Sequence, residues 1–83
     1  MSKLIVEPIK PSLAHRGNYP RSFRWRGRFY RITDLGGAWA EAGRWWEGQT
    51  ERKFLRVLTD RNVVADLCFE PKRAQWLLYR VYD

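Results

Sequence analysis

The chain has 83 residues, of which 45% are hydrophobic and 30% are charged, and its formal net charge is +7 at pH 7. A chain of this length forms one small domain that removes only roughly 60 to 65% of its unfolded surface from water, so its core needs large side chains. Five Trp, four Tyr and four Phe residues supply them. This aromatic content favours a compact β-structure over a helical bundle, which would need more Leu and Ala at helical spacing.

The excess positive charge lies in the first part of the chain. Residues 1–33 contain eight Lys or Arg and a single carboxylate, Glu7, whereas residues 34–83 contain eight residues of each sign. Six Arg and no carboxylate lie between His15 and Thr33. A local surface that attracts anions explains this distribution better than a generally basic exterior does.

Several functional classes find no support in the sequence. Cys68 is the only cysteine, so one chain can form neither an internal disulfide nor a cysteine metal site. The only histidine, His15, lies in a segment rich in Pro and Gly, and the carboxylates of Asp66 and Glu70 are about 13 Å apart on an extended strand. There is no nucleophile with its base, no phosphate-binding Gly loop and no metal-ligand spacing. We therefore predict a binding module with no catalytic residues, metal or cofactor, rather than an enzyme.

The N-terminal segment suggests where the protein resides. Its short apolar run, residues 4–6, is too short for a signal peptide or a membrane span. With only one cysteine in the chain, a reducing compartment also fits. We expect a cytoplasmic protein with no membrane partner, either a monomer or a dimer.

Residues 1–20 are predicted to be an N-terminal arm followed by a loop, and residues 21–83 a single small β-domain. Residues 4–9 suit an edge strand or an arm that pairs with a sheet edge, because Pro8 and Pro11 disfavour a central position. Residues 11–20, rich in Pro, Gly and Asn, are typical of a loop or extended linker.

The clearest strand pattern begins at residue 22. Apolar and cationic residues alternate, which places Phe23 and Trp25 on one face and Arg24 and Arg26 on the other. Gly27 tolerates positive φ, and a β-rich aromatic run follows it. We therefore predict a hairpin over residues 22–33 that turns at Arg26-Gly27, with guanidinium groups interleaved with aromatic rings on its exposed face.

The composition changes after the hairpin. Small residues and two adjacent glycines surround Trp39, and Gly43 suits a helix C-cap, so we predict a short helix over residues 38–42 that Trp39 holds against the sheet. Trp45 and Trp46 then suit a short strand. Because neighbouring residues of a strand face opposite sides, one of these rings should be inside and the other partly exposed.

Three further strands are expected in the second half of the chain. Residues 54–59 place Leu55 and Val57 on one face, and residues 63–70 direct four apolar side chains inward and Asp66, Cys68 and Glu70 outward. Residues 76–82 are apolar on both faces, as in a strand enclosed within a sheet.

Neighbouring carboxylates should raise the pKa of the Cys68 thiol and leave it unreactive. The rings expected in the core are those of Trp25, Trp39, Phe69, Trp76 and Tyr79.

The elements together predict an all-β fold with at most one short helix. Five or six short strands recur at about ten-residue spacing and are joined by hairpin turns. This arrangement indicates a small antiparallel meander that curls into an SH3-like or OB-like, partly open barrel.

Four motifs stand out across residues 22–83. They are Phe23-x-Trp25-Arg26-Gly27-Arg28-x-Tyr30-x-Ile32, Gly43-x-Trp45-Trp46-Glu47, Arg56-Val57 and Trp76-x-Leu78-Tyr79-Arg80-Val81-Tyr82. In these motifs the chain resembles a small bacterial domain family of unknown function, which is found alone and at the C-terminus of ImuB-type proteins, the inactive homologues of Y-family DNA polymerases in the SOS mutasome. The resemblance implies association with DNA-damage tolerance or a polymerase complex, and it assigns no reaction.

The arginines of the hairpin are the candidate functional residues. The residues expected to contact nucleic acid are Arg21, Arg24, Arg26, Arg28 and Arg31, with Phe29, Trp45 and Trp46 as rings for base stacking. We predict a module that binds single-stranded or damaged DNA in bacterial DNA repair. The alternatives are an adaptor that docks on a polymerase or another repair subunit through an exposed Trp, self-association through strand edges, or arginines that only keep a sheet edge soluble.

Overall fold

The computed structural model describes residues 2–12, 15–16, 19–42 and 51–82, and these residues contain strands and no helix. The strands are β1 (Ser2–Pro8), β2 (Lys10–Pro11), β3 (His15–Arg16), β4 (Tyr19–Pro20), β5 (Ser22–Trp25), β6 (Arg28–Glu41), β7 (Arg52–Thr59), β8 (Val64–Glu70) and β9 (Gln75–Tyr82). The all-β fold class predicted from the sequence is therefore confirmed.

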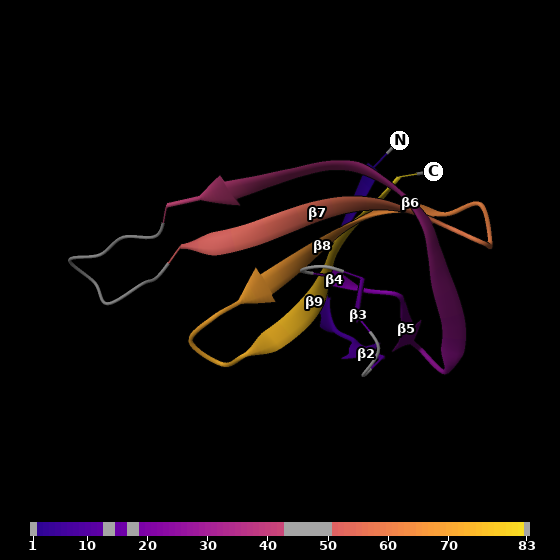
Figure 1. The fold of residues 1–83 in the computed structure, drawn as a ribbon, viewed down its shortest axis with the longest axis horizontal. Helices are drawn as coiled ribbons and strands as arrows, with labels where there is room; N and C mark the ends of the chain where they lie inside the picture. The colour runs from indigo at the N-terminus through magenta and orange to yellow at the C-terminus, as the bar shows by residue number, and fades with distance from the viewer. Residues whose placement is uncertain (1, 13–14, 17–18, 43–50, 83) are drawn as a thin grey trace.

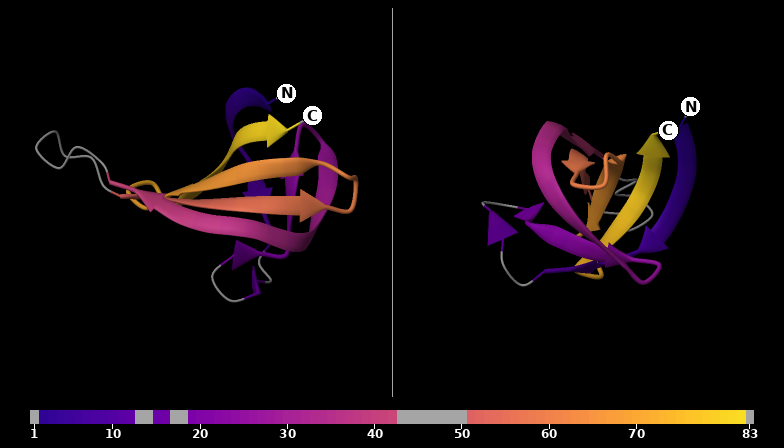
Figure 2. Two further views of the ribbon diagram at one scale, coloured as in Figure 1. Left: turned by 90° about the horizontal axis from the view of Figure 1, so that it is seen from above. Right: turned by 90° about the vertical axis from the view of Figure 1, so that its right-hand side faces the viewer.

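Seven of these strands form one antiparallel sheet in the order β1-β9-β8-β7-β6-β5-β2, and β3 pairs with β4 in a separate two-stranded sheet. Strands β6 to β9 form a meander, with each strand next to its neighbour in sequence. The large sheet curls into a half-barrel, which Figure 2 shows nearly end-on in its right-hand view. In Figure 1 the β6–β7 pair extends well beyond the other strands.

Strand β1 is one edge of the sheet and pairs with the C-terminal strand β9, which agrees with the edge-strand alternative for residues 4–9. Residues 11–20 were expected to be a loop, but they include the end of β2 and the short β3–β4 hairpin. Strand β2 pairs with β5, and Lys10 lies directly opposite Arg24. The N-terminal segment therefore adds one strand at each end of the sheet.

The turn of the predicted hairpin is confirmed. Trp25 pairs with Arg28 across a two-residue turn, in which Arg26 has a φ of 51° and Gly27 a φ of 76°. Positive φ at both central residues is the mark of a type I′ turn, whose twist matches that of the flanking strands. The hairpin thus needs the glycine that the sequence places there.

The predicted helix over residues 38–42 is wrong for the part that the structure describes, since residues 38–41 belong to β6. Trp39 pairs with Phe54 of β7, and the two rings stack with centroids 5.4 Å apart. Ala38 pairs likewise with Leu55. These cross-strand contacts outweigh the weak helix preference of a short stretch rich in alanine. Gly43, the expected helix cap, lies outside the described residues.

Two register shifts bend β6, one between Ile32 and Asp34 and one between Leu35 and Gly37. An extra residue on one strand increases the local twist and turns the strand away from a flat sheet. A Cβ at Gly36 would lie 3.3 Å from Cγ of Arg56, so a side chain at the second shift would require Arg56 to move by a few tenths of an ångström. These bends allow one strand to pair with β5 at its start and with β7 along the rest of its length.

The core lies on the concave face of the half-barrel. Its buried members are Ile9, Phe23, Tyr30, Val57, Ala65, Leu67 and Leu78. Trp25 and Trp76 are half-buried and pack against this cluster, in line with their expected core positions. Phe69 and Tyr79 are also half-buried. Trp39 was expected in the core but is 37% exposed, because it belongs to a strand rather than a helix and its ring lies on the opposite face.

The convex face contains a buried polar cluster that the sequence did not indicate. Asp66 was expected to point into solvent, yet it is only 3% exposed. Its carboxylate accepts hydrogen bonds from Nε of Arg56 at 2.9 Å and from the hydroxyl of Tyr82 at 2.5 Å. Arg56 also donates to the Tyr82 hydroxyl at 2.6 Å. Three polar side chains from β7, β8 and β9 thus satisfy one another on a face that was expected to be solvated.

Cys68 is on the same convex face and is fully buried. The expected direction of its pKa shift is confirmed, but the main cause differs, because burial rather than a neighbouring carboxylate raises the pKa of the thiol most. A buried thiol with a raised pKa is a poor nucleophile.

Candidate nucleic-acid interface

One face of the β2–β5–β6 region gathers positive charge around an exposed ring. Lys10, Arg24 and Phe29 are successive cross-strand partners, so their side chains lie in one row on the same face. Arg31 is opposite Ser22 and lies two residues from Phe29, on the same face. The ring of Phe29 is 46% exposed, and all three cationic side chains are exposed.

A surface hollow of about 430 Å³ adjoins this row. It brings together Arg21 and Arg31, the aromatic rings of Tyr19 and Phe29, and the hydroxyl groups of Ser12 and Ser22. We refer to Lys10, Arg21, Arg24, Phe29 and Arg31 as the hairpin face. The hollow has the size of a small-ligand site and combines donors for anions with flat apolar rings.

The backbone of the hairpin face is held by the turn between β7 and β8. The backbone N–H of Arg31 donates to the carboxylate of Asp60 at 3.1 Å, and the backbone N–H of Asp60 donates to the carbonyl of Arg31 at 2.9 Å. Nε of Arg61 donates to the carbonyl of Phe29 at 2.9 Å. These bonds use backbone atoms of β6, so the guanidinium of Arg31 keeps its donors for another partner.

The cations of the hairpin face are not neutralised within the described part of the chain. The two ion pairs there join Arg26 to Glu7 and Arg56 to Asp66, and neither involves a residue of the hairpin face. Several like charges thus lie close together on one surface, and none of them forms an ion pair with a carboxylate of the described residues. Such a surface attracts anions, and it does so more strongly at low salt.

Arg26 was expected beside Arg24, and this part of the prediction is wrong. Its guanidinium folds back over the ring of Trp25, with Cζ 4.6 Å from the ring centroid, and donates to Glu7 at 3.0 and 2.6 Å. The indole N–H of Trp25 donates to the same carboxylate at 2.9 Å. The hydrogen bond from Arg26 is the main reason that the pKa of Glu7 is lowered. The turn residue thus anchors β1 instead of joining the hairpin face.

The other predicted residues separate into three groups. Arg28 pairs with Trp25 and therefore lies on the face opposite to Arg24. Arg21, Arg24, Phe29 and Arg31 are brought together on the hairpin face. Trp45 and Trp46, the proposed stacking rings, lie outside the described residues.

Sequence reasoning missed Lys10 and Tyr19. Tyr19 lies in the segment expected to be a loop, and Lys10 lies between that segment and the predicted edge strand. Only the pairing of β2 with β5 brings Lys10 beside Arg24. The sole signal for Lys10 was the charge asymmetry of residues 1–33, which concerns a region and not a position. Tyr19 carried no signal at all.

Among the described residues, His, Cys, Asp and Glu side chains do not gather in a group of three that could hold a metal ion. A helix that could cross the membrane is likewise not found in that part of the chain.

The fold and the hairpin face together define a small all-β half-barrel domain with a basic and aromatic surface. The chain belongs to a family described as a domain of unknown function (DUF6504), which matches it over residues 1–83. No curated protein and no solved structure matches the chain.

Proposed function

We propose that this domain binds single-stranded nucleic acid, with DNA as the expected form, through the hairpin face. The observation that carries the proposal is the row Lys10–Arg24–Phe29, in which a half-exposed aromatic ring lies directly beside two cations that have no carboxylate partner among the described residues. A base can stack on the ring while the cations contact the phosphates on either side. This combination of rings and cations is how many proteins hold single strands without reading their sequence.

The expected strength of binding follows from these contacts. Stacking of one base on Phe29 contributes roughly 1 to 3 kcal/mol. Contacts from Lys10, Arg21, Arg24 and Arg31 to four phosphates would give a dependence of log K on log salt concentration with a slope of about −3. Affinity in the micromolar range at low salt is the reasonable expectation for such a small interface.

The cellular setting that we propose is bacterial DNA repair or translesion synthesis. The resemblance of the four sequence motifs to the C-terminal domain of ImuB-type proteins supports it. A domain that holds single-stranded or damaged DNA would suit a complex that copies past lesions. The adaptor alternative, docking on a polymerase or another repair subunit, assigned a role to Trp45 and Trp46, which lie outside the described residues.

The test is fluorescence anisotropy with a labelled twelve-nucleotide oligothymidylate. Because Arg24 and Phe29 form the centre of the row, we expect Arg24→Glu to weaken binding at least tenfold and Phe29→Ala to weaken it about five- to a hundredfold. Raising the salt concentration should weaken binding by wild-type protein with a slope of about −3.

Arg28→Glu is the matched control, because it makes the same change of charge on the same hairpin but on the opposite face. We expect it to change affinity less than threefold. Phe29→Trp should keep or improve binding. If Arg24→Glu and Arg28→Glu weaken binding equally, only the net charge matters and the hairpin face is not the site. If the wild-type protein does not bind the oligonucleotide at low salt, the proposed function is wrong.

A further inference from the structure

The second half of β6 has one edge that no described strand covers. Its residues 34–41 pair with β7 along one side, whereas β5 pairs only with residues 28–31 on the other side. All side chains from Thr33 to Glu41 are exposed. An edge of this length presents a row of backbone N–H and C=O groups that can pair with another extended chain.

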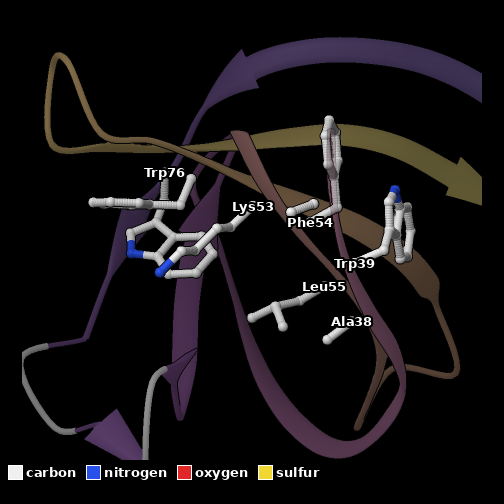
Figure 3. A pocket seen from close by; sticks show the side chains of 8 residues that line it. Ala38, Trp39, Lys53, Phe54, Leu55 and Trp76 are labelled. Carbon is white, nitrogen blue, oxygen red and sulfur yellow. The ribbon is translucent and has the colours of Figure 1, made fainter. Parts of the chain in front are cut away.

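An apolar hollow of about 600 Å³ is lined by side chains of β6 and of the neighbouring strands β7, β8 and β9 (Figure 3). Ala38 and Ala40 of β6 form the side of the hollow next to the free edge. The other lining residues are Trp39 of β6, Lys53, Phe54 and Leu55 of β7, Phe69 of β8 and Trp76 of β9. Since the alanine side chains are short, side chains of a chain added at the edge could reach across them to the larger apolar groups.

The opposite face of the same edge carries Trp39, whose ring stacks on Phe54 and stays 37% exposed. In Figure 3 the rings of Trp39 and Phe54 lie on the other side of the strands from Leu55 and Ala38. An added strand would therefore meet apolar surface on both of its faces. It would also complete the backbone hydrogen bonds of β6.

The charge at the hollow indicates the chemistry of the occupant. Lys53 pairs with Ala40, so its side chain lies on the lining face, where it is exposed and takes part in neither of the ion pairs of the described residues. A cation at the rim of an apolar hollow complements a carboxylate on an otherwise apolar ligand. A nucleic-acid strand fits less well, since this hollow offers one cation for phosphates and a nucleic acid cannot pair with the backbone N–H and C=O groups of the edge.

A second copy of the chain fits poorly at the same edge. Antiparallel pairing of two β6 edges about the centre of residues 34–41 would place Asp34 of one copy opposite Glu41 of the other. Like charges directly opposite each other destabilise a strand pair. The net charge of +7 on each copy adds further repulsion.

We propose that the free edge of β6 and the adjoining hollow form a docking site for an extended segment of a partner protein. The segment adds as a strand to residues 34–41, directs apolar side chains into the hollow and places a carboxylate beside Lys53. This mode of recognition takes its affinity from backbone hydrogen bonds and its specificity from alternate side chains. The site is at the other end of β6 from the hairpin face, so it does not depend on nucleic-acid binding.

The probe is a labelled nine-residue peptide, acetylated and amidated, in which threonine alternates with valine and one valine is replaced by glutamate. We expect anisotropy to show saturable binding, and amide NMR signals of residues 34–41 to shift. N-methylation of alternate peptide amides on one edge should abolish binding, whereas N-methylation on the other edge should not, because a strand added to a sheet uses only one of its edges.

Lys53→Glu should weaken binding of this peptide at least tenfold. A second peptide, with lysine in place of the glutamate, should bind the Lys53→Glu variant about as tightly as the first peptide binds the wild-type protein. Lys3→Glu, on the exposed side of β1, is the matched control and should have less than a twofold effect. The charge exchange tests the site even if the variant is less stable. Equal loss with both N-methylated peptides, NMR shifts confined to the hairpin face, or a concentration-dependent dimer that the peptide does not disrupt would each overturn the proposal.

Discussion

At the scale of single residues, the cluster of Arg56, Asp66 and Tyr82 shows how this small domain accommodates a buried charge. Asp66 is the one buried charged side chain among the described residues. Arg56 and Tyr82 satisfy its oxygens, and Cζ of Arg56 also lies 4.7 Å from the centroid of the Tyr82 ring. A buried carboxylate would be strongly destabilising without such partners. The cluster therefore ties β7, β8 and β9 together on the convex face.

The hydrogen bond that Tyr82 donates to Asp66 is the main reason that the pKa of its phenol is raised. A raised pKa in the folded state means that this bond stabilises the fold fully below the ordinary tyrosine pKa of about 10, and that the contribution is lost as pH rises through the higher folded value. We therefore expect Tyr82→Phe to be less stable than wild type at pH 8, with the difference shrinking above pH 10. Urea denaturation from pH 8 to 11 measures it. A constant difference would contradict the prediction.

At the scale of secondary-structure elements, the β5–β6 hairpin depends on its turn. Gly27 has a φ of 76°, which an L-residue with a side chain adopts at a cost of roughly 1 to 2 kcal/mol. Arg26 accepts a φ of 51° while its guanidinium holds Glu7 of β1. The strain at Arg26 is thus associated with a contact that joins the N-terminal strand to the hairpin.

Gly27→Ala should lower the free energy of unfolding by roughly 1 to 2 kcal/mol, because it places a Cβ on a left-handed residue. Gly37→Ala is the matched control, since Gly37 has ordinary φ and a Cβ there would meet nothing within 4 Å. We expect that control to be neutral or slightly stabilising, as alanine reduces the freedom of the unfolded chain. Chemical denaturation compares the two variants. Equal losses would show that the turn does not need positive φ at residue 27.

At the scale of the whole molecule, the half-barrel has one core that all parts of the sheet share. The cluster includes Ile9 from the N-terminal segment, Phe23 and Tyr30 from the hairpin, and Leu67 and Leu78 from the meander. Phe23 and Tyr30 stack with centroids 5.2 Å apart. Because these residues come from distant parts of the chain, the domain should unfold as one cooperative unit.

Leu67→Ala should destabilise the domain by about 2 to 5 kcal/mol, because Leu67 is completely buried at the centre of the core. Leu58→Ala makes the same chemical change on the convex face, where Leu58 is 38% exposed, and should cost less than about 1 kcal/mol. Circular dichroism and tryptophan fluorescence should report the same transition for both variants. Transitions at different denaturant concentrations by the two probes would contradict a single cooperative core.

Local sequence patterns were enough to predict the strand content, most strand positions and the turn of the hairpin. These features depend on local rules: alternation of apolar and polar residues, and positive φ at Gly27. The helix predicted over residues 38–42 was wrong, because a short stretch rich in alanine has little intrinsic preference and the partner strand decides its conformation. The charge asymmetry of the sequence also indicated the region that carries the cationic surface, but it did not identify Lys10.

Which cations share a face and which charges are buried depends on contacts between strands that are distant in sequence. Lys10 meets Arg24 through the pairing of strands far apart in sequence, and Arg26 leaves that face because Glu7 of the edge strand binds it. Asp66 is buried because Arg56 lies directly opposite it and Tyr82 is near enough to donate a hydrogen bond. Such contacts depend on register and on sheet curvature, which arise from the whole sheet and not from any local pattern.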